Sequence, residues 1–148
     1  MCWHALAPVF SQARNSARRT ACLTNEKTLV VGVLQYAQDW DDTLPAANRW
    51  ADLSSKYTAP GIDAKLYHCP EATSRFSYAF NSGLGEQRLP DAEVSAHTVL
   101  LFEANVPIKN AFGGRELLVH PPRNDTKDVF SFADGRVKLH KPSEVDLH

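Results

Sequence analysis

Residues 6–38 have the sequence LAPVFSQARNSARRTACLTNEKTLVVGVLQYAQ, and this stretch decides the fold. Its β-branched centre, residues 28–34, could alternatively form a strand. The flanking segments show neither turn signals nor alternation, which favours one continuous helix. At about 1.5 Å per residue this helix is roughly 50 Å long. Pro8 lies near its start, as a first-turn residue or, if the helix begins further upstream, at a kink.

At 100° per residue the expected helix carries two apolar stripes of different texture. The small stripe comprises Leu6, Phe10, Ala13, Ala17, Ala21, Thr24 and Thr28, and Val31 continues it. The bulky stripe comprises Cys22, Leu29, Val33, Tyr36 and Trp40. We expect the bulky stripe to face the chain's own sheet, which Gly32 would allow to approach closely, and the small stripe to face another subunit. Alternatively, the helix serves only its own core and the small stripe is solvated.

Length and charge restrict the class of protein. The chain has 148 residues, 43% of them hydrophobic, which is enough for one domain spanning residues 1–148. Its net charge of −1 gives no sign of an anionic partner. The helix is locally basic, through Arg14, Arg18, Arg19 and Lys27. No aromatic residues are interleaved with these cations for base stacking, so we expect no nucleic-acid partner.

The chain has three cysteines. Cys22 belongs to the bulky stripe, and Cys69 ends the segment KLYHCP, which must cross the domain. A disulfide between them would stabilise the folded state by about 4 kcal/mol on the chain-entropy estimate, because it closes a loop in the unfolded chain. It would also imply an oxidising compartment. The alternative is two buried thiols.

The rest of the chain predicts an irregular connection followed by a sheet. Residues 39–75 contain a helix break at Pro45 and a short helical turn that carries Trp50 and Tyr57. Residues 76–140 are expected to form four or five mostly antiparallel strands. The expected strands are RFSYAFN, HTVLLFEAN, RELLVH and the hairpin VFSFADGRVKLH, in which Asp134 and Gly135 form the turn, and NAFGG is expected to be a turn. The predicted fold is therefore α+β, with one long helix laid on the sheet.

Several pieces of the chain, in order, resemble one family. Residues 6–45 resemble the region just after the membrane half of bacterial prepilin-like proteins, the type II secretion pseudopilins and their relatives. The similar subgroup carries FPVFxxARExAR…C…N…YxxDYDExLP, then W…L…Y…F/Y-x-CP, and a C-terminal FADGHVK hairpin. The matching residues here are Ala7–Phe10, Ala13, Arg14, Ala17, Arg18, Cys22, Asn25, Tyr36–Pro45, Trp50, Leu53, Tyr57, Tyr67, Cys69, Pro70 and Phe132–Lys138.

The resemblance implies a pilin-like fold and a role as a filament subunit. Helices of pilin-like proteins pack together in the filament core while the heads face outward, so the small stripe would be the inter-subunit face. The implied partners are other pilin-like subunits and inner-membrane assembly machinery. The full-length protein would be anchored in the inner membrane and face the periplasm or the cell surface, whereas the chain as given is expected to be soluble.

Two departures from the family pattern stand out. The leader, the processing site and the apolar segment of about twenty residues are not in this sequence, so leader cleavage, N-methylation and membrane anchoring are assigned to no residue here. We expect codons upstream of Met1 to encode that segment. Relatives often have a His nine residues before the Asp-Gly turn. Here His120 is further from Asp134, which puts any role for that histidine in doubt.

Candidate chemistry is sparse, and we expect no enzyme and no cofactor. Asp39, Asp41 and Asp42 could bind calcium or act as paired carboxylates in glycoside hydrolysis, but they match no loop motif. A zinc site assembled from His68, Cys69, Cys22, His120 and His140 lacks ligand spacing. Nucleophile, phosphate-binding and dinucleotide motifs are absent.

These observations favour a structural subunit of a type II secretion pseudopilus or type IV pilus-like filament. One rival is an extracytoplasmic module that binds a sugar or a peptide at an exposed Trp50 and Tyr57. A third reading is a small hydrolase that uses the acidic cluster, with Asp41 as the residue to test.

Overall fold

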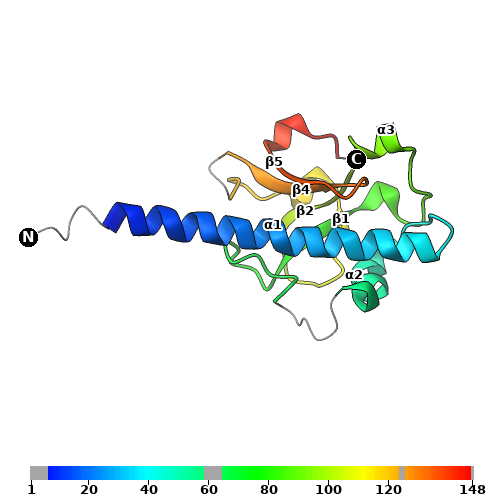
Figure 1. Cartoon of the computed structure of the whole chain (residues 1–148), viewed down its shortest axis with the longest axis horizontal. Coiled ribbons are helices and arrows are strands. Elements are labelled where there is room, and N and C mark those ends of the chain that lie inside the picture. The colour runs from blue at the N-terminus through cyan, green and yellow to red at the C-terminus, as the bar shows by residue number, and fades with distance from the viewer. Residues whose placement is uncertain (1–6, 59–64, 124–125, 148) are drawn as a thin grey trace, which may run out of the picture.

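The structure is a computed structural model that describes residues 7–58, 65–123 and 126–147. Its longest element is α1 (Ala7–Asp39), one continuous helix of 33 residues, which confirms the helix expected from the sequence. The C-terminal half of α1 lies on the head, and the N-terminal half extends beyond it (Figure 1). Among the described residues no helix has the combination of length and apolarity needed to cross a bilayer.

The head is built on a five-stranded sheet with the order β3-β1-β2-β4-β5. Its strands are β1 (Phe76–Asn81), β2 (Val99–Val106), β3 (Phe112–Gly113), β4 (Asp128–Phe132) and β5 (Val137–His140). Neighbouring strands are antiparallel except β1 and β3, which are parallel. The predicted α+β fold, a long helix on a mostly antiparallel sheet, is confirmed and is consistent with a pilin-like fold.

Two strand predictions in the segment after β2 are wrong. RELLVH is not a strand, because residues Arg115–Leu117 form a 3₁₀ turn and Leu118 makes only an isolated bridge to Ala104. β2 already has β1 and β4 on its two sides, so this apolar run instead buries Leu118 and Val119 against the sheet. NAFGG, expected to be a turn, supplies β3 as the edge strand beside β1.

The hairpin between β4 and β5 is where the sequence placed it, but its turn differs. The Phe132 carbonyl accepts from the Gly135 amide at 2.8 Å, and the Phe132 amide donates to the Arg136 carbonyl at 2.9 Å. Gly135 is the turn residue with positive φ, at 84°. This is a three-residue loop, a type I turn closed by a left-handed glycine, and not the two-residue turn that needs positive φ at both Asp134 and Gly135.

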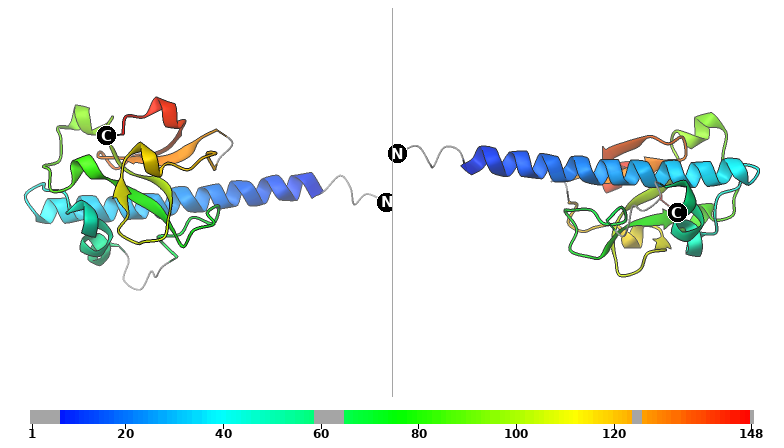
Figure 2. Two further views of the ribbon diagram at one scale, coloured as in Figure 1. Left: turned by 180° about the vertical axis from the view of Figure 1, so that it is seen from behind. Right: turned by 60° about the horizontal axis from the view of Figure 1, so that its bottom comes forward.

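Both faces of the sheet are covered, which explains the continuous apolar run of β2. The first layer lies between the sheet and α1 and contains Leu29, Val33 and Tyr78 among others. The second layer lies on the far face, around Phe102 and Phe130, where Leu118, Val145 and Leu147 close it. The views in Figure 2 show α1 along one side of the sheet and the C-terminal segments away from it.

The bulky stripe packs on the head over most of its length. Cys22, Leu29 and Val33 are fully buried. Trp40 is a wrong assignment to this stripe: it is 56% exposed and stacks on the half-buried Tyr36 with ring centroids 5.6 Å apart. At this end α1 extends beyond the sheet and lies beside α2 (Trp50–Ser54), so no strand covers Trp40.

Short helices and turns complete the head: α3 (Ala92–Ser95) and the 3₁₀ turns Ala47–Arg49, Ser55–Tyr57, Ser82–Leu84 and Pro142–Glu144. The close approach expected at Gly32 is present, but the partner is not the sheet. A Cβ on Gly32 would lie 2.8 Å from the Thr58 Cγ2 atom and 3.5 Å from the Ser54 carbonyl oxygen. Gly32 therefore admits the segment after α2 and not the sheet.

Candidate functional site

The N-terminal half of α1 is a rod that projects from the head (Figures 1 and 2). Residues 8–18 are all exposed, and full burial on α1 begins only at Cys22. Two large apolar side chains are presented here: Val9 is 59% exposed and Phe10 is 61% exposed. Four other large apolar side chains are exposed in the described part of the chain, but Val9 and Phe10 are adjacent on an uncovered helix, which makes the rod a candidate interaction surface.

The small stripe follows this rod and continues onto the head. Leu6 lies outside the described residues. Phe10, Ala13, Ala17 and Thr24 are exposed, whereas Ala21, Thr28 and Val31 are half-buried. No described segment of the chain covers Ala13 and Ala17, so an inter-subunit role for this face stays a prediction.

The threonine hydroxyls along this face, from Thr20 on the rod to Thr28 where α1 lies on the head, are satisfied within the helix itself. Thr20 donates to the Ser16 carbonyl at 3.0 Å, Thr24 to the Thr20 carbonyl at 2.9 Å and Thr28 to the Thr24 carbonyl at 3.0 Å. These side chains therefore need no polar partner when another surface covers them. With the alanines they form a narrow face that a second helix can approach closely.

A groove extends this face along the head. It runs between α1 and the edge strand β5, with a volume of about 520 Å³. Leu23, Thr24 and Val137 contribute apolar surface, and Lys27 and Lys138 contribute cations. Lys27 also donates to the Gly135 carbonyl, which ties α1 to the β4–β5 hairpin.

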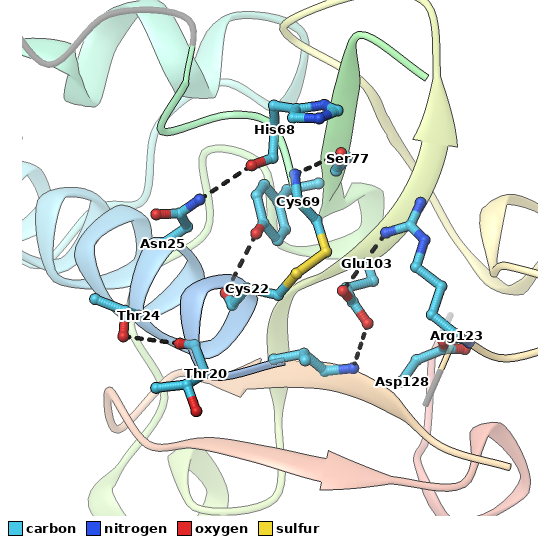
Figure 3. The surroundings of a disulfide bond; sticks show 12 residues. Thr20, Cys22, Thr24, Asn25, His68, Cys69, Ser77, Glu103, Arg123 and Asp128 are labelled. Carbon is cyan, nitrogen blue, oxygen red and sulfur yellow. Dashed lines mark hydrogen bonds and ion pairs between the residues drawn. A yellow bond between two sulfur atoms is a disulfide. The ribbon is translucent and has the colours of Figure 1, made fainter. Parts of the chain in front are cut away.

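The predicted bridge between Cys22 and Cys69 is present, at the point where the rod meets the head (Figure 3). The two Cα atoms lie 4.9 Å apart and both residues are fully buried. Hydrogen bonds flank the bridge. Tyr78 Oη donates to the Cys22 carbonyl at 3.2 Å, and Asn25 Nδ2 donates to the His68 carbonyl at 3.0 Å. The rod is thus fixed to the head by a covalent bond and by the polar contacts beside it.

A cluster of buried acidic groups, which sequence reasoning missed, lies next to the bridge, and Figure 3 shows Glu103, Asp128 and Arg123 of this cluster. Glu26, Glu103 and Asp128 are each fully buried, and the guanidinium of Arg123 faces them with its side chain 5% exposed. Arg123 Nη1 lies 3.5 Å from Glu103 Oε1, and the Val129 amide donates to Glu103 Oε2 at 2.8 Å.

The burial of these carboxyls changes their protonation. Desolvation raises the pKa of Glu103 to about 7, against the lowering effect of Val129 and Arg123. Burial, reinforced by the nearby Glu103, raises the pKa of Glu26 well above its usual value. Neither carboxyl oxygen of Glu26 has a hydrogen-bond partner among the described residues, and the nearby Ser131 hydroxyl donates to the Leu101 carbonyl instead. Burial thus favours the neutral, protonated form of the Glu26 carboxyl.

A signal for this cluster exists in the sequence. Glu26 follows Cys22 by four residues, which puts it on the buried side of α1, and Glu103 interrupts the apolar run of β2. A carboxyl at a core position is unusual and is expected to be protonated or paired.

The candidate metal ligands do not form a centre. Among the residues the structure describes, the group of potential ligands that lies together is Cys22, Cys69 and Glu103, within 4.8 Å of one another. Both sulfurs are used by the disulfide, so neither is a thiolate ligand. His68 Nδ1 instead lies 3.0 Å from the Ser74 carbonyl, and His140 lies beside Glu144.

The acidic residues after α1 form an exposed turn. Asp41 and Asp42 have positive φ, at 51° and 56°, and all three aspartates are exposed. Tyr57 Oη donates to Asp39 Oδ2 at 2.6 Å, and Asp42 lies 3.8 Å from Arg88. The aspartates thus point to separate partners and do not converge.

Trp50, which the ligand-binding alternative needs at the surface, is a core residue. It is fully buried, and its Nε1 donates to the Ala111 carbonyl at 2.9 Å. No family model, characterised protein or solved structure matches this chain.

Proposed function

We propose that this chain is a structural subunit of a filament of the type II secretion pseudopilus or type IV pilus-like class, and that it assembles through the projecting half of α1. The observation that carries the proposal is the uncovered face of that rod. Ala13 and Ala17 are exposed on it, and the hydroxyls of Thr20 and Thr24 are bonded to the backbone of the helix. A surface of this kind suits close helix–helix packing.

Two further features support this reading. The rod is held to the head by the Cys22–Cys69 bridge, so a contact made by the rod positions the whole subunit. The α+β arrangement of a long helix on a mostly antiparallel sheet also fits the resemblance to prepilin-like proteins. The proposed partners are other pilin-like subunits and inner-membrane assembly machinery, with the heads in the periplasm or at the cell surface.

The role is structural, and we propose no catalytic residue. Asp39, Asp41 and Asp42 lie in solvent, whereas an acid in glycoside hydrolysis works from a desolvated site. The ligand-binding alternative needs Trp50 at the surface as its main aromatic residue, but Trp50 is buried in the core.

Self-association of the chain tests the proposal. Ala13→Glu with Ala17→Glu places two charges on the small stripe, and Gln12→Glu with Asn15→Glu places the same charges on the other side of the rod. We expect sedimentation velocity and negative-stain microscopy to show assembly of the native chain and of the second variant, and loss of assembly in the first. Equal loss in both variants, or a native chain that stays monomeric at millimolar concentration, would refute the proposal.

A further inference from the structure

The charges of α1 differ between its two ends. No acidic residue lies between Ala7 and Asn25, and Arg14 and Arg18 are exposed on the rod. At the other end three exposed aspartates follow closely, where the helix dipole already contributes negative charge and the last turn has no basic residue. Arg88 approaches Asp42 at 3.8 Å with 78% of its side chain exposed, a separation that compensates little of this charge.

An exposed aromatic ring lies among these carboxylates. Trp40 is 56% exposed and is held in place by stacking on Tyr36, which Tyr57 contacts edge-on at 6.2 Å. Asp39 is fixed beside them by the Tyr57 hydroxyl. A ring face next to carboxylates is a surface that binds a guanidinium well, through a cation–π contact and an ion pair together.

The spacing along α1 fits this surface to the rod of another copy. Arg14 and Asp39 are separated by about 25 residues, which is roughly 37 Å and close to seven full turns. They therefore project from the same side of α1, the side of the small stripe. Arg18 lies one turn after Arg14, as Asp41 and Asp42 lie shortly after Asp39. An axial displacement of this size, combined with a half turn about an axis parallel to α1, therefore brings both arginines near carboxylates.

We propose that the acidic end of α1 in one subunit, formed by Asp39, Trp40 and Asp41, receives Arg14 and Arg18 from the rod of a second copy. The proposal rests on the proposed function and names the surface of the neighbour that the rod contacts. The contact is heterologous, because the two copies use different surfaces, and it repeats into an open chain. Because the head flanks the C-terminal half of α1 (Figure 1), the displacement places one head beyond the end of the next.

A charge exchange between copies tests this pairing. One variant carries Arg14→Glu and Arg18→Glu, and the other carries Asp39→Lys and Asp41→Lys. We expect each variant alone to self-associate about fivefold to tenfold more weakly than the native chain, as for the loss of two partly exposed ion pairs. An equimolar mixture is expected to recover association, measured by sedimentation velocity at low salt. The matched control, Lys127→Glu with Lys141→Glu, reverses two exposed charges of the head that line neither the groove nor the acidic end of α1, and it is expected to leave association unchanged.

Position-specific cross-linking gives a second readout. In a Cys2→Ser background, a chain with Arg18→Cys is mixed with a chain with Asp41→Cys under mild oxidation. We expect a disulfide-linked heterodimer by non-reducing mass spectrometry, and none when Lys141→Cys replaces Asp41→Cys. Association that is weakened by neither charge reversal, or that the mixture does not recover, would overturn this contact. If Ala13→Glu with Ala17→Glu still abolishes assembly in that case, the filament proposal survives and only the receiving surface is wrong.

Discussion

The two halves of α1 belong to one helix but obey different constraints. The docked half, from Cys22 to Ala37, buries its side chains against the sheet and α2, and it even takes a carboxyl, Glu26, into the core. The projecting half buries nothing between Pro8 and Arg18. A continuous helical pattern therefore determines the helix but not what surrounds it, which depends on where the head ends.

Removal of the Cys22–Cys69 bridge, at the boundary between the two halves, is expected to have the largest effect on stability. Cys22→Ser with Cys69→Ser removes a constraint worth about 4 kcal/mol in the free energy of unfolding on the chain-entropy estimate. Urea denaturation measures the change, with dithiothreitol on the native chain as the matched treatment. A loss below about 1 kcal/mol would show that the polar contacts of Tyr78 and Asn25 already fix the helix.

Equivalent truncations in the two halves sharpen the contrast. Leu29→Ala empties a fully buried position and is expected to cost about 3 kcal/mol. Phe10→Ala removes a larger side chain that is 61% exposed, and it is expected to change the free energy of unfolding of the monomer by less than about 0.5 kcal/mol. Similar losses for the two variants at low protein concentration would mean that the rod is covered in the monomer.

The stability of the head should also depend on pH, through the buried carboxyls of Glu26 on the docked half and Glu103 on β2. Because the folded state keeps Glu103 protonated up to about pH 7, it binds more protons than the unfolded chain above the ordinary pKa near 4.5. The contribution of Glu103 to the free energy of unfolding therefore falls by roughly 2 to 3 kcal/mol as the pH rises from about 4.5 to about 7. Glu26, with its pKa raised well above its usual value, adds to the fall.

Guanidinium denaturation at a series of pH values tests this. Glu26→Gln removes one of the two coupled carboxyls and is expected to flatten the profile. Glu93→Gln, at an exposed position outside the cluster, is the control. A native profile that rises from pH 5 to pH 7 would contradict the assignment.

The smallest expected effect concerns the contact of the docked half with the segment after α2. Gly32→Ala gains about 1 kcal/mol of helix propensity but brings its Cβ to 2.8 Å from the Thr58 methyl. We expect a net loss of about 1 kcal/mol, because that methyl belongs to a buried residue and cannot move freely. Combining Gly32→Ala with Thr58→Ser removes the clash and should restore or exceed native stability in thermal unfolding.

Much of the fold is encoded in local patterns that a single sequence displays. The helical period of residues 6–38, the apolar run of β2 and the Asp134-Gly135 turn each predict their own element. RELLVH shows the limit, because a six-residue segment with three apolar residues fits a buried turn as well as a strand, and both sides of β2 are already paired with β1 and β4.

The same limit applies to the candidate site. Cys22 and Cys69 could be singled out from their segments, but their pairing depends on the crossing of residues 65–69 over α1. Trp40 continues the period of the bulky stripe and is nevertheless exposed, because the extent of the sheet along the helix is a tertiary property. Trp50 is the reverse case, since a carbonyl from a segment sixty residues away accepts its indole N–H in the core.

The position of the Cys22–Cys69 bridge has a mechanical consequence. Traction on the free end of α1 passes through two sulfur atoms into the chain leading to β1, and shear between helix and sheet carries only the remainder. Covalent bonds resist forces far above those that separate packed side chains. A filament built from such subunits would therefore part between neighbours before any single head unravelled.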